Sequence, residues 1–310
     1  RSPACRSPEK TSPERKALPM SESPLISVVI PVYNASRFLR EALSSVLMQS
    51  FSDWEILAVD DASTDSSPEI LKRFQKESSL PGERFRILRN ERNRGVAFSR
   101  NRGVREAQGK WIAFLDADDL WEARKLERQL SLLTSSHSEN EVPGLSPFPA
   151  SSLSSPLLFT ASGFMKENGE RIPYILEVPE RIRREELLKQ NLISCSSVLC
   201  KRDWLLRFPM PEQPGIHEDF AVWLQILSET PFALGLNEPL LLYRVSSSSK
   251  SGNKLCAAKM NWRTYRYLGL SPLRSLLLMA HYSFRNLKKW RTIRRAGKKA
   301  DLTASGNSPA

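Results

Sequence analysis

An apolar run that ends in three carboxylates limits the fold of this chain more than any other stretch. The run is Trp111-Ile112-Ala113-Phe114-Leu115, and Asp116, Asp118 and Asp119 follow it. A continuous apolar run predicts a strand that is buried on both faces, as in a parallel sheet. Ligands of open α/β sheets bind just beyond the carboxyl ends of such strands.

Three acids within four residues repel one another, so we expect a cation to hold them together. A divalent metal that also binds a phosphate is the natural candidate, because such ions take oxygen ligands. The alternative is a solvated acidic turn before a helix, where aspartate is favoured in any case.

Strands and helices alternate along residues 25–133. The predicted strands are 25–33, 54–59, 85–88 and 111–115, and the predicted helices are 39–47, 67–74, 95–107 and 124–133. This alternation predicts a parallel sheet built with right-handed crossovers.

The chain is less regular beyond this point. Residues 135–156 are rich in Ser and Pro and predict an insertion without regular structure. The remaining predictions are strands at 157–163 and 195–200, helices at 185–192 and 220–227, a hairpin turn at Asn168-Gly169, and two short strands within 233–245.

A second acidic cluster lies at the end of another strand. Asp60 and Asp61 follow the strand 54–59, and Pro31 and Tyr33 lie at the exit of the first strand. An aromatic ring beside acids at one sheet edge suits a nucleotide, whose base stacks on the ring while a carboxylate accepts hydrogen bonds from base or ribose. The alternative is turn chemistry, since the segment Asp-Asp-Ala-Ser-Thr-Asp is rich in turn-forming residues.

Arginines flank the start of the helix 95–107. Arg94 and Arg100 are placed to reach phosphates in a bidentate manner, or else they only cover a helix face. No Gly-x-Gly-x-x-Gly segment occurs, which argues against a dinucleotide site of the Rossmann type.

At this point the residues resemble a known family. The segments SVVIPVYNASRFLREALSSVLMQSFSDWEILAVDDASTD and RNRGVAFSRNRGVREAQGKWIAFLDADDLW resemble the nucleotide-binding half of family 2 inverting glycosyltransferases of bacterial polysaccharide and teichuronic-acid biosynthesis. The resemblance covers residues 25–133, weakens across 135–180 and returns at 215–224. It implies an α/β fold of the GT-A type with a mostly parallel central sheet.

The resemblance also implies a division of the chain. Residues 25–134 would form a Rossmann-like half that binds the nucleotide sugar, and the insertion 135–156 would follow it. Residues 157–256 would form a smaller α+β half that binds the acceptor. Residues 257–310 would form C-terminal helices in a basic amphipathic segment and tail.

Individual site residues are implied in the same way. Pro31, Tyr33, Asp60 and Asp61 would line the base and ribose pocket. Asp116 and Asp118 match the DxD motif that holds Mn2+ or Mg2+. Asp219 matches the catalytic base, although alone it reads as an acid at a helix N-terminus. The chain departs from the pattern after Tyr243-Arg244, where many relatives carry a metal-binding histidine and here Val245-Ser246 follow.

The implied activity is the metal-dependent transfer of a sugar, with inversion, from a UDP-sugar donor to a glycan or lipid-linked acceptor. This transfer would be a step in the synthesis of cell-surface polysaccharide. An acceptor hydroxyl needs a general base, and a departing diphosphate needs charge neutralisation. The alternative is a non-catalytic nucleotide-sugar-binding protein, and the presence of both Asp118 and Asp219 argues against it.

The ends of the chain have their own composition. Residues 1–24, rich in Ser, Pro, Lys and Arg, predict a disordered lead, and a first methionine at Met20 predicts that 1–19 lie upstream of the natural start. The four cysteines show neither zinc-type pairing nor a disulfide framework, which favours the thiols of a cytoplasmic protein. No apolar run approaches the roughly 18 residues of a membrane span.

The net charge of +12 resides in the C-terminal part of the chain. No acid occurs between Glu238 and Asp301, whereas basic residues are frequent there. Leu273, Leu276, Leu277 and Ala280 recur at helical spacing, with Phe284 and Leu287 beyond them. This pattern predicts an amphipathic helix that lies on an anionic membrane surface, which we expect to be the inner face of the cell membrane. It does not predict a nucleic-acid partner. The alternative is a helix packed on the protein with a solvated basic end.

Overall fold

The structure is a computed structural model, and it describes residues 23–135, 155–245, 254–283, 285 and 291–293. The predicted lead and most of the Ser/Pro-rich insertion lie outside the described residues, as do Phe284 and Leu287.

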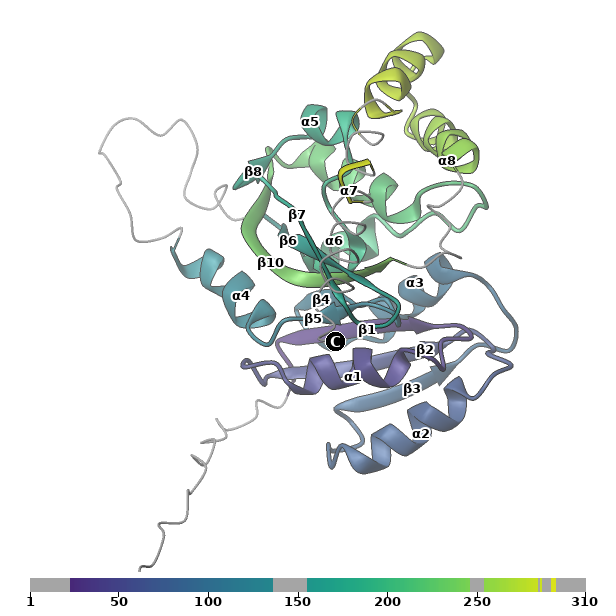
Figure 1. The fold of residues 1–310 in the computed structure, drawn as a ribbon, viewed down its shortest axis with the longest axis vertical. Helices are drawn as coiled ribbons and strands as arrows, with labels where there is room; N and C mark the ends of the chain where they lie inside the picture. Colours follow the sequence, from purple (N-terminus) through teal and green to yellow (C-terminus); the bar gives the residue numbers. More distant parts are fainter. Residues whose placement is uncertain (1–22, 136–154, 246–253, 284, 286–290, 294–310) are drawn as a thin grey trace, which may run out of the picture.

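One ten-stranded sheet runs through both predicted halves, in the order β3-β2-β1-β4-β9-β6-β10-β5, with β7 paired to β6 and β8 to β10 (Figure 1). The strands are β1 (Ile26–Val32), β2 (Trp54–Asp60), β3 (Phe85–Arg89), β4 (Trp111–Phe114), β5 (Leu120–Trp121), β6 (Leu157–Lys166), β7 (Arg171–Leu176), β8 (Arg181–Ile182), β9 (Leu199–Lys201) and β10 (Ala233–Val245). The longest pairings, β1 with β2 and β6 with β10, are parallel. The predicted α/β architecture with a mostly parallel central sheet is confirmed.

Helices cover both faces of the sheet. They are α1 (Leu39–Leu47), α2 (Ser67–Glu77), α3 (Val96–Glu106), α4 (Lys125–Ser135), α5 (Arg184–Lys189), α6 (Arg202–Arg207), α7 (Glu218–Glu229) and α8 (Lys254–Tyr267), and residues 272–283 form a further helix. Alternate residues of β1 point to opposite faces. Val28 and Ile30 pack with α1, α2 and α4, whereas Val29 packs with α3 and α7. Among the described helices, none has both the length and the apolar character needed to cross a membrane.

The register of the strands brings their carboxyl ends together. Val32 of β1 lies opposite Asp60 of β2, and Val29 lies opposite Phe114 of β4. The segments that follow these strands therefore leave the sheet at one edge, as predicted for a parallel arrangement. The antiparallel strand β9 pairs with β4, so the chain just before β9 also lies at this edge.

Two predicted elements differ from the structure. Residues 195–200 are not one strand, because a 3-10 turn, η2 (Cys195–Ser197), precedes β9. The backbone N–H and the Oγ of Ser197 both donate to the carbonyl of Ser194, at 2.9 and 2.7 Å, and this curls the chain. Residues 233–245 are one strand rather than two, and its register against β6 shifts on either side of Pro239, which has no N–H to donate.

Other predictions were incomplete. The short elements β5 and α6 were not predicted, and α5 ends at Lys189 because Gln190 is extended. The predicted hairpin turn at Asn168-Gly169 is confirmed between β6 and β7, with Gly169 at φ 85°.

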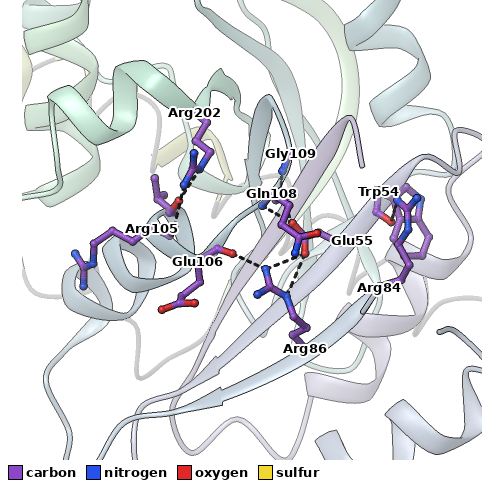
Figure 2. A network of polar contacts seen from close by, with 11 residues as sticks. Trp54, Glu55, Arg84, Arg86, Arg105, Glu106, Gln108, Gly109 and Arg202 are labelled. Carbon is purple, nitrogen blue, oxygen red and sulfur yellow. Dashed lines mark hydrogen bonds and ion pairs between the residues drawn. The ribbon is translucent and has the colours of Figure 1, made fainter. Parts of the chain in front are cut away.

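A buried carboxylate fastens the turn that leads into β4. Glu55 of β2 is fully buried and accepts hydrogen bonds from Ser27 Oγ at 2.6 Å and from the Gln108 backbone N–H at 2.7 Å. Arg86 of β3 completes the pairing at 3.0 Å, and Figure 2 shows its guanidinium between Glu55 and the end of α3. Ser27 Oγ in turn accepts a hydrogen bond from Gly109 N–H at 2.8 Å. This network sets where β4 begins.

Gly109 leaves no room for a side chain. A Cβ at this position would lie 2.6 Å from Ser27 N and 2.8 Å from Ile26 C, both of them backbone atoms of β1. We therefore expect Gly109→Ala to lower the free energy of unfolding by about 1–3 kcal/mol, the usual range for overpacking. Urea denaturation measures it. Gly82→Ala is the matched control, because nothing lies within 4 Å of the added carbon; equal stability of the two variants would contradict the account of this turn.

Candidate active site

The three aspartates after β4 form a turn that residues of the C-terminal half hold in place. Asp119 is buried, and its carboxylate accepts hydrogen bonds from Ser196 Oγ at 2.7 Å and from the Arg244 backbone N–H at 3.0 Å. Ser196 Oγ also accepts a hydrogen bond from the Asp116 backbone N–H at 3.0 Å. Arg244 Nε donates to the carbonyl of Asp118 at 2.8 Å. The turn is therefore shaped by η2 and β10, which lie far away in the sequence.

The carboxylate of Asp118 is the least satisfied of the three. It receives no hydrogen bond from another residue in the described part of the chain, whereas Asp116 accepts one from Arg100 Nη2 at 2.6 Å. Burial and the nearby Asp116 raise the pKa of Asp118 to about 6. Burial together with Asp118 and Asp116 raises the pKa of Asp119 well above its usual range. A cation near Asp118 would relieve this repulsion.

Asp116 and Asp118 fit a divalent metal only in part. No group of three or more His, Cys, Asp or Glu side chains among the described residues is placed to hold a metal ion. Two carboxylates on one turn, one of them without a donor, match the oxygen chemistry that Mg2+ or Mn2+ prefers, and the remaining ligands would come from a phosphate or water. The predicted pair of metal ligands is chemically suitable. The segment that follows Val245, where the resemblance led us to expect a histidine, lies outside the described residues.

Arg100 connects this turn to a second acidic group. Its side chain is 5% exposed, and its Nη1 lies 3.0 Å from Glu218 Oε1 while Nη2 binds Asp116. Its Nε has no hydrogen-bond partner among the described residues. Both ends of the guanidinium therefore bind carboxylates here, and its predicted contact with phosphate stays a prediction. The arginine joins β4 to the first turn of α7.

Asp219 lies in that same first turn and faces this cluster. It is half-buried, and its Oδ1 accepts the backbone N–H of Phe220 at 2.7 Å. Burial and the neighbouring Glu218 raise the pKa of Asp219 to about 7. A carboxyl group whose pKa is near neutral is suited to accept and release a proton. The helix start is fixed from α8, because His217 N–H donates to Thr264 Oγ1 at 3.0 Å.

Asp60 and Asp61 take different roles at the end of β2. Asp61 accepts hydrogen bonds from Asn90 Nδ2 at 2.6 Å and from the backbone N–H groups of Arg94 and Gly95 at 2.9 and 2.7 Å, so it orders the loop before α3. Asp60 accepts one bond from Ser63 N–H at 3.0 Å. Its buried Oδ2 accepts no hydrogen bond from the described residues and lies 3.4 Å from Nη1 of Arg89, with which it forms an ion pair. Asp60 is therefore the better placed of the two to accept from a ligand.

Tyr33 and Arg94 remain accessible beside these acids. Tyr33 is 51% exposed at the exit of β1, one residue after Val32 and two after Pro31, and its ring is free to stack on a base. The guanidinium of Arg94 lies 4.0 Å above the ring of Phe98 and is partly exposed. The structure thus brings the predicted residues of both acidic clusters to one edge of the sheet.

Three residues of this site were not predicted as site residues. Ser196, Glu218 and Arg244 hold the aspartates or Arg100, and each is distant from its partners in sequence. Arg244 carried a signal in the sequence, since it directly follows the apolar run 240–243 in the predicted strand. Ser196 carried none, because buried serines are common in loops.

Removal of the Ser196 hydroxyl should loosen the aspartate turn. Ser196→Ala leaves a buried oxygen of Asp119 and the N–H of Asp116 without partners, so we expect a loss of about 1–3 kcal/mol in the free energy of unfolding. Chemical denaturation measures this loss. Ser228→Ala is the control, because its hydroxyl makes an exposed bond to Gln225 O within α7. A loss no larger than that of the control would show that Ser196 does not support the turn.

Comparison with known proteins identifies similar sequences. Residues 27–150 match the family model described as glycosyl transferase family 2. The chain is 35% identical over 243 residues to TuaG of Bacillus subtilis, a glycosyltransferase named for teichuronic acid biosynthesis, with 78% of this chain and 88% of TuaG covered. It is 31% identical over 277 residues to Escherichia coli WfgD, named as a UDP-Glc:alpha-D-GlcNAc-diphosphoundecaprenol beta-1,3-glucosyltransferase, with 89% and 98% covered.

Solved structures share the fold at lower sequence identity. Residues 1-349 of S. aureus TarS, in complex with UDP-GlcNAc, match with a TM-score of 0.62 at 17% identity, over 83% of this chain and 71% of that TarS chain. The mannosyltransferase PcManGT from Pyrobaculum calidifontis, in complex with GDP-Man and Mn2+, matches with a TM-score of 0.60 at 18% identity, over 95% and 80%.

Proposed function

Because the chain belongs to glycosyltransferase family 2, and is a glycosyltransferase with the predicted GT-A fold, we propose that it transfers a sugar with inversion from a UDP-sugar to a lipid-linked acceptor. A place in the synthesis of cell-surface polysaccharide follows from relatives such as TuaG and WfgD. The transfer requires a divalent metal, Mn2+ or Mg2+.

One observation carries this proposal. Arg100 binds Asp116 of the DxD turn and Glu218 of α7, so that the proposed metal ligands and the proposed base Asp219 face one another across a single buried guanidinium. A donor phosphate at the turn and an acceptor hydroxyl at α7 would then meet between them. A protein that only stored nucleotide sugars would have no use for a carboxylate with a pKa near neutral opposite the phosphate site.

The donor is assigned from the relatives that share most sequence. WfgD, at 31% identity, and WfaP, at 27%, are both named for UDP-Glc. TarS, seen with UDP-GlcNAc, and PcManGT, seen with GDP-Man, are 17% and 18% identical and support the fold alone. Tyr33 would stack on the uracil, and Asp60 Oδ2, which accepts no hydrogen bond from the described residues, would accept one from the base or the ribose.

The acceptor is assigned in the same way. WfgD and a second E. coli relative, WfaP, which is 27% identical over 267 residues, are both named for transfer to alpha-D-GlcNAc-diphosphoundecaprenol. We assign an acceptor of this class, a sugar on a polyprenyl diphosphate, to the present chain.

The residues of the chain divide the reaction between them. Asp219 takes the proton from the acceptor hydroxyl as that oxygen attacks the anomeric carbon, and a single displacement inverts the configuration. Asp116 and Asp118 would hold the metal, which when bound neutralises charge on the departing diphosphate. Arg100 keeps Asp116 oriented and places a positive charge between the two acidic groups. Asp60 and Tyr33 fix the nucleotide, so the sugar lies over the aspartate turn.

Loss of the Asp118 charge should abolish metal-dependent donor binding. For Asp118→Asn we expect the affinity for UDP to become independent of added Mn2+ and turnover to be lost, because one of two carboxylate ligands is gone. Calorimetric titration of UDP with and without Mn2+ tests this, with Asp203→Asn on the exposed start of α6 as the control. An unchanged metal dependence in the Asp118 variant would remove this residue from the metal site.

Loss of the Asp219 base should slow transfer without weakening donor binding. For Asp219→Asn we expect transfer roughly 10²-fold slower or more, as for loss of a general base. Glu229→Gln at the other end of α7 is the matched control.

The pH profile gives a second reading of the same residue. A base must be ionised, and the pKa of Asp219 is raised to about 7, so kcat/KM of the unaltered enzyme should fall about tenfold per unit as the pH drops below that value. The Asn variant should lack this acidic limb. If the Asp219→Asn variant transfers sugar at a rate within about tenfold of the unaltered enzyme, or if its pH profile keeps the acidic limb, the base is another group.

A further inference from the structure

The helix 272–283 has two apolar faces, and only one of them packs on the protein. Leu278, Met279 and Tyr282 pack against the core cluster that includes α7, and Ser275 beside them is fully buried. The ring of Tyr282 lies 6.0 Å from that of Phe220, the residue after Asp219. The helix is therefore packed on the protein along this face, as the alternative interpretation of the sequence predicted.

The opposite face is exposed and consists of leucine and alanine. Leu273, Leu276 and Leu277 are 70%, 60% and 65% exposed, and Ala280 beside them is exposed as well. Their spacing of i, i+3, i+4 and i+7 places all four on one stripe of the helix. We call these four residues the leucine face.

The leucine face is unusual on this surface. The other large apolar side chains that are exposed in the described residues include Met48, Ile175 and Leu206, which belong to separate elements. Scattered exposed apolar residues are normal, whereas a contiguous stripe on a helix marks an interaction surface. In Figure 1 this helix follows α8 and lies at the end of the molecule farthest from β3 and α2.

Exposed basic residues precede and follow the leucine face in the chain. Exposed basic side chains lie on α8 and just beyond the helix: Lys259, Arg263, Arg266, Arg285 and Arg291. The sequence contains no acid from 239 to 300. Glu185 of α5 contacts this helix from another element, and Arg274 neutralises it in a pair at 2.8 Å. The exposed charges described on either side of the leucine face in the chain are therefore cationic.

We propose that the leucine face docks on an anionic lipid bilayer, with its leucines in the interface and the surrounding cations on the headgroups. This combination of an apolar stripe and flanking basic residues is the one that interfacial helices use. A second copy of the chain is a poor occupant, because two cationic surfaces would face each other. The docking does not depend on the identity of donor or acceptor.

Docking here would bring the proposed base close to the membrane. The packed face of the same helix contacts Phe220 at the start of α7, and α8 holds the backbone of His217 through Thr264. The membrane contact and the first turn of α7 are thus one packed unit. If the proposed function holds, the acceptor diphosphate would be presented at this height.

Vesicle flotation of the full chain tests the proposal. We expect binding to phosphatidylcholine vesicles that contain phosphatidylglycerol, weaker binding to pure phosphatidylcholine, and release by high salt. The variant Leu273→Gln, Leu276→Gln, Leu277→Gln should bind roughly tenfold less or weaker, because three apolar side chains leave the interface. Glutamine keeps the helix propensity of leucine.

The control removes as many exposed apolar side chains elsewhere. Met48→Gln, Ile175→Thr, Leu206→Gln should float like the unaltered chain, and both triple variants should unfold at the same temperature as that chain. If the leucine triple does not fold, the single changes Leu273→Gln and Leu277→Gln give the same test, each with a partial loss of binding. No binding of the unaltered chain to anionic vesicles, or equal binding of the leucine variants, would overturn the proposal. So would a dimer that the leucine variants convert to a monomer, since the face would then be a self-interface.

Discussion

Repulsion among Asp116, Asp118 and Asp119 is the constraint to which the rest of the site is adapted. Each aspartate meets it differently. Asp116 is paired with Arg100, Asp119 is buried against Ser196 and the Arg244 backbone, and Asp118 is left without a donor from the described residues. The first two arrangements are fixed by the fold, and the third leaves a carboxylate whose charge a bound cation would compensate. A site of this kind gains affinity for a cation because the protein itself leaves one carboxylate unsatisfied.

The single sheet explains how two halves of the chain can share this site. β9 pairs with β4 and brings Ser196 beneath the aspartate turn, while β10 pairs with β5 and brings Arg244 over it. Arg100 then reaches from α3 to α7. The distance between the proposed donor site and the proposed base is therefore set by buried polar contacts rather than by a flexible hinge between domains.

The sequence was informative wherever a pattern is local. The strand before Asp116 and the alternation of strands and helices follow from periodicity, so both could be predicted from the order of the residues alone. Asp219 was different, because two acids at a helix start fit any helix, and only the family resemblance singled it out. Ser196 and Arg244 could not be assigned, since their partners lie 77 and 125 residues away from them. The helical spacing of Leu273 and Leu276 was visible in the sequence, but not which face of the helix would be covered.

The bond between Asp119 and Arg244 has a consequence for recombination between relatives. A chimera that exchanges residues 25–134 alone would inherit the three aspartates from one parent and their supports from the other. Positions 119, 196 and 244 form one unit of inheritance, although 125 residues separate the first from the last. Substitutions at these positions should accordingly covary across the family. A crossover point chosen from sequence order alone would separate the aspartate from the two residues that hold it.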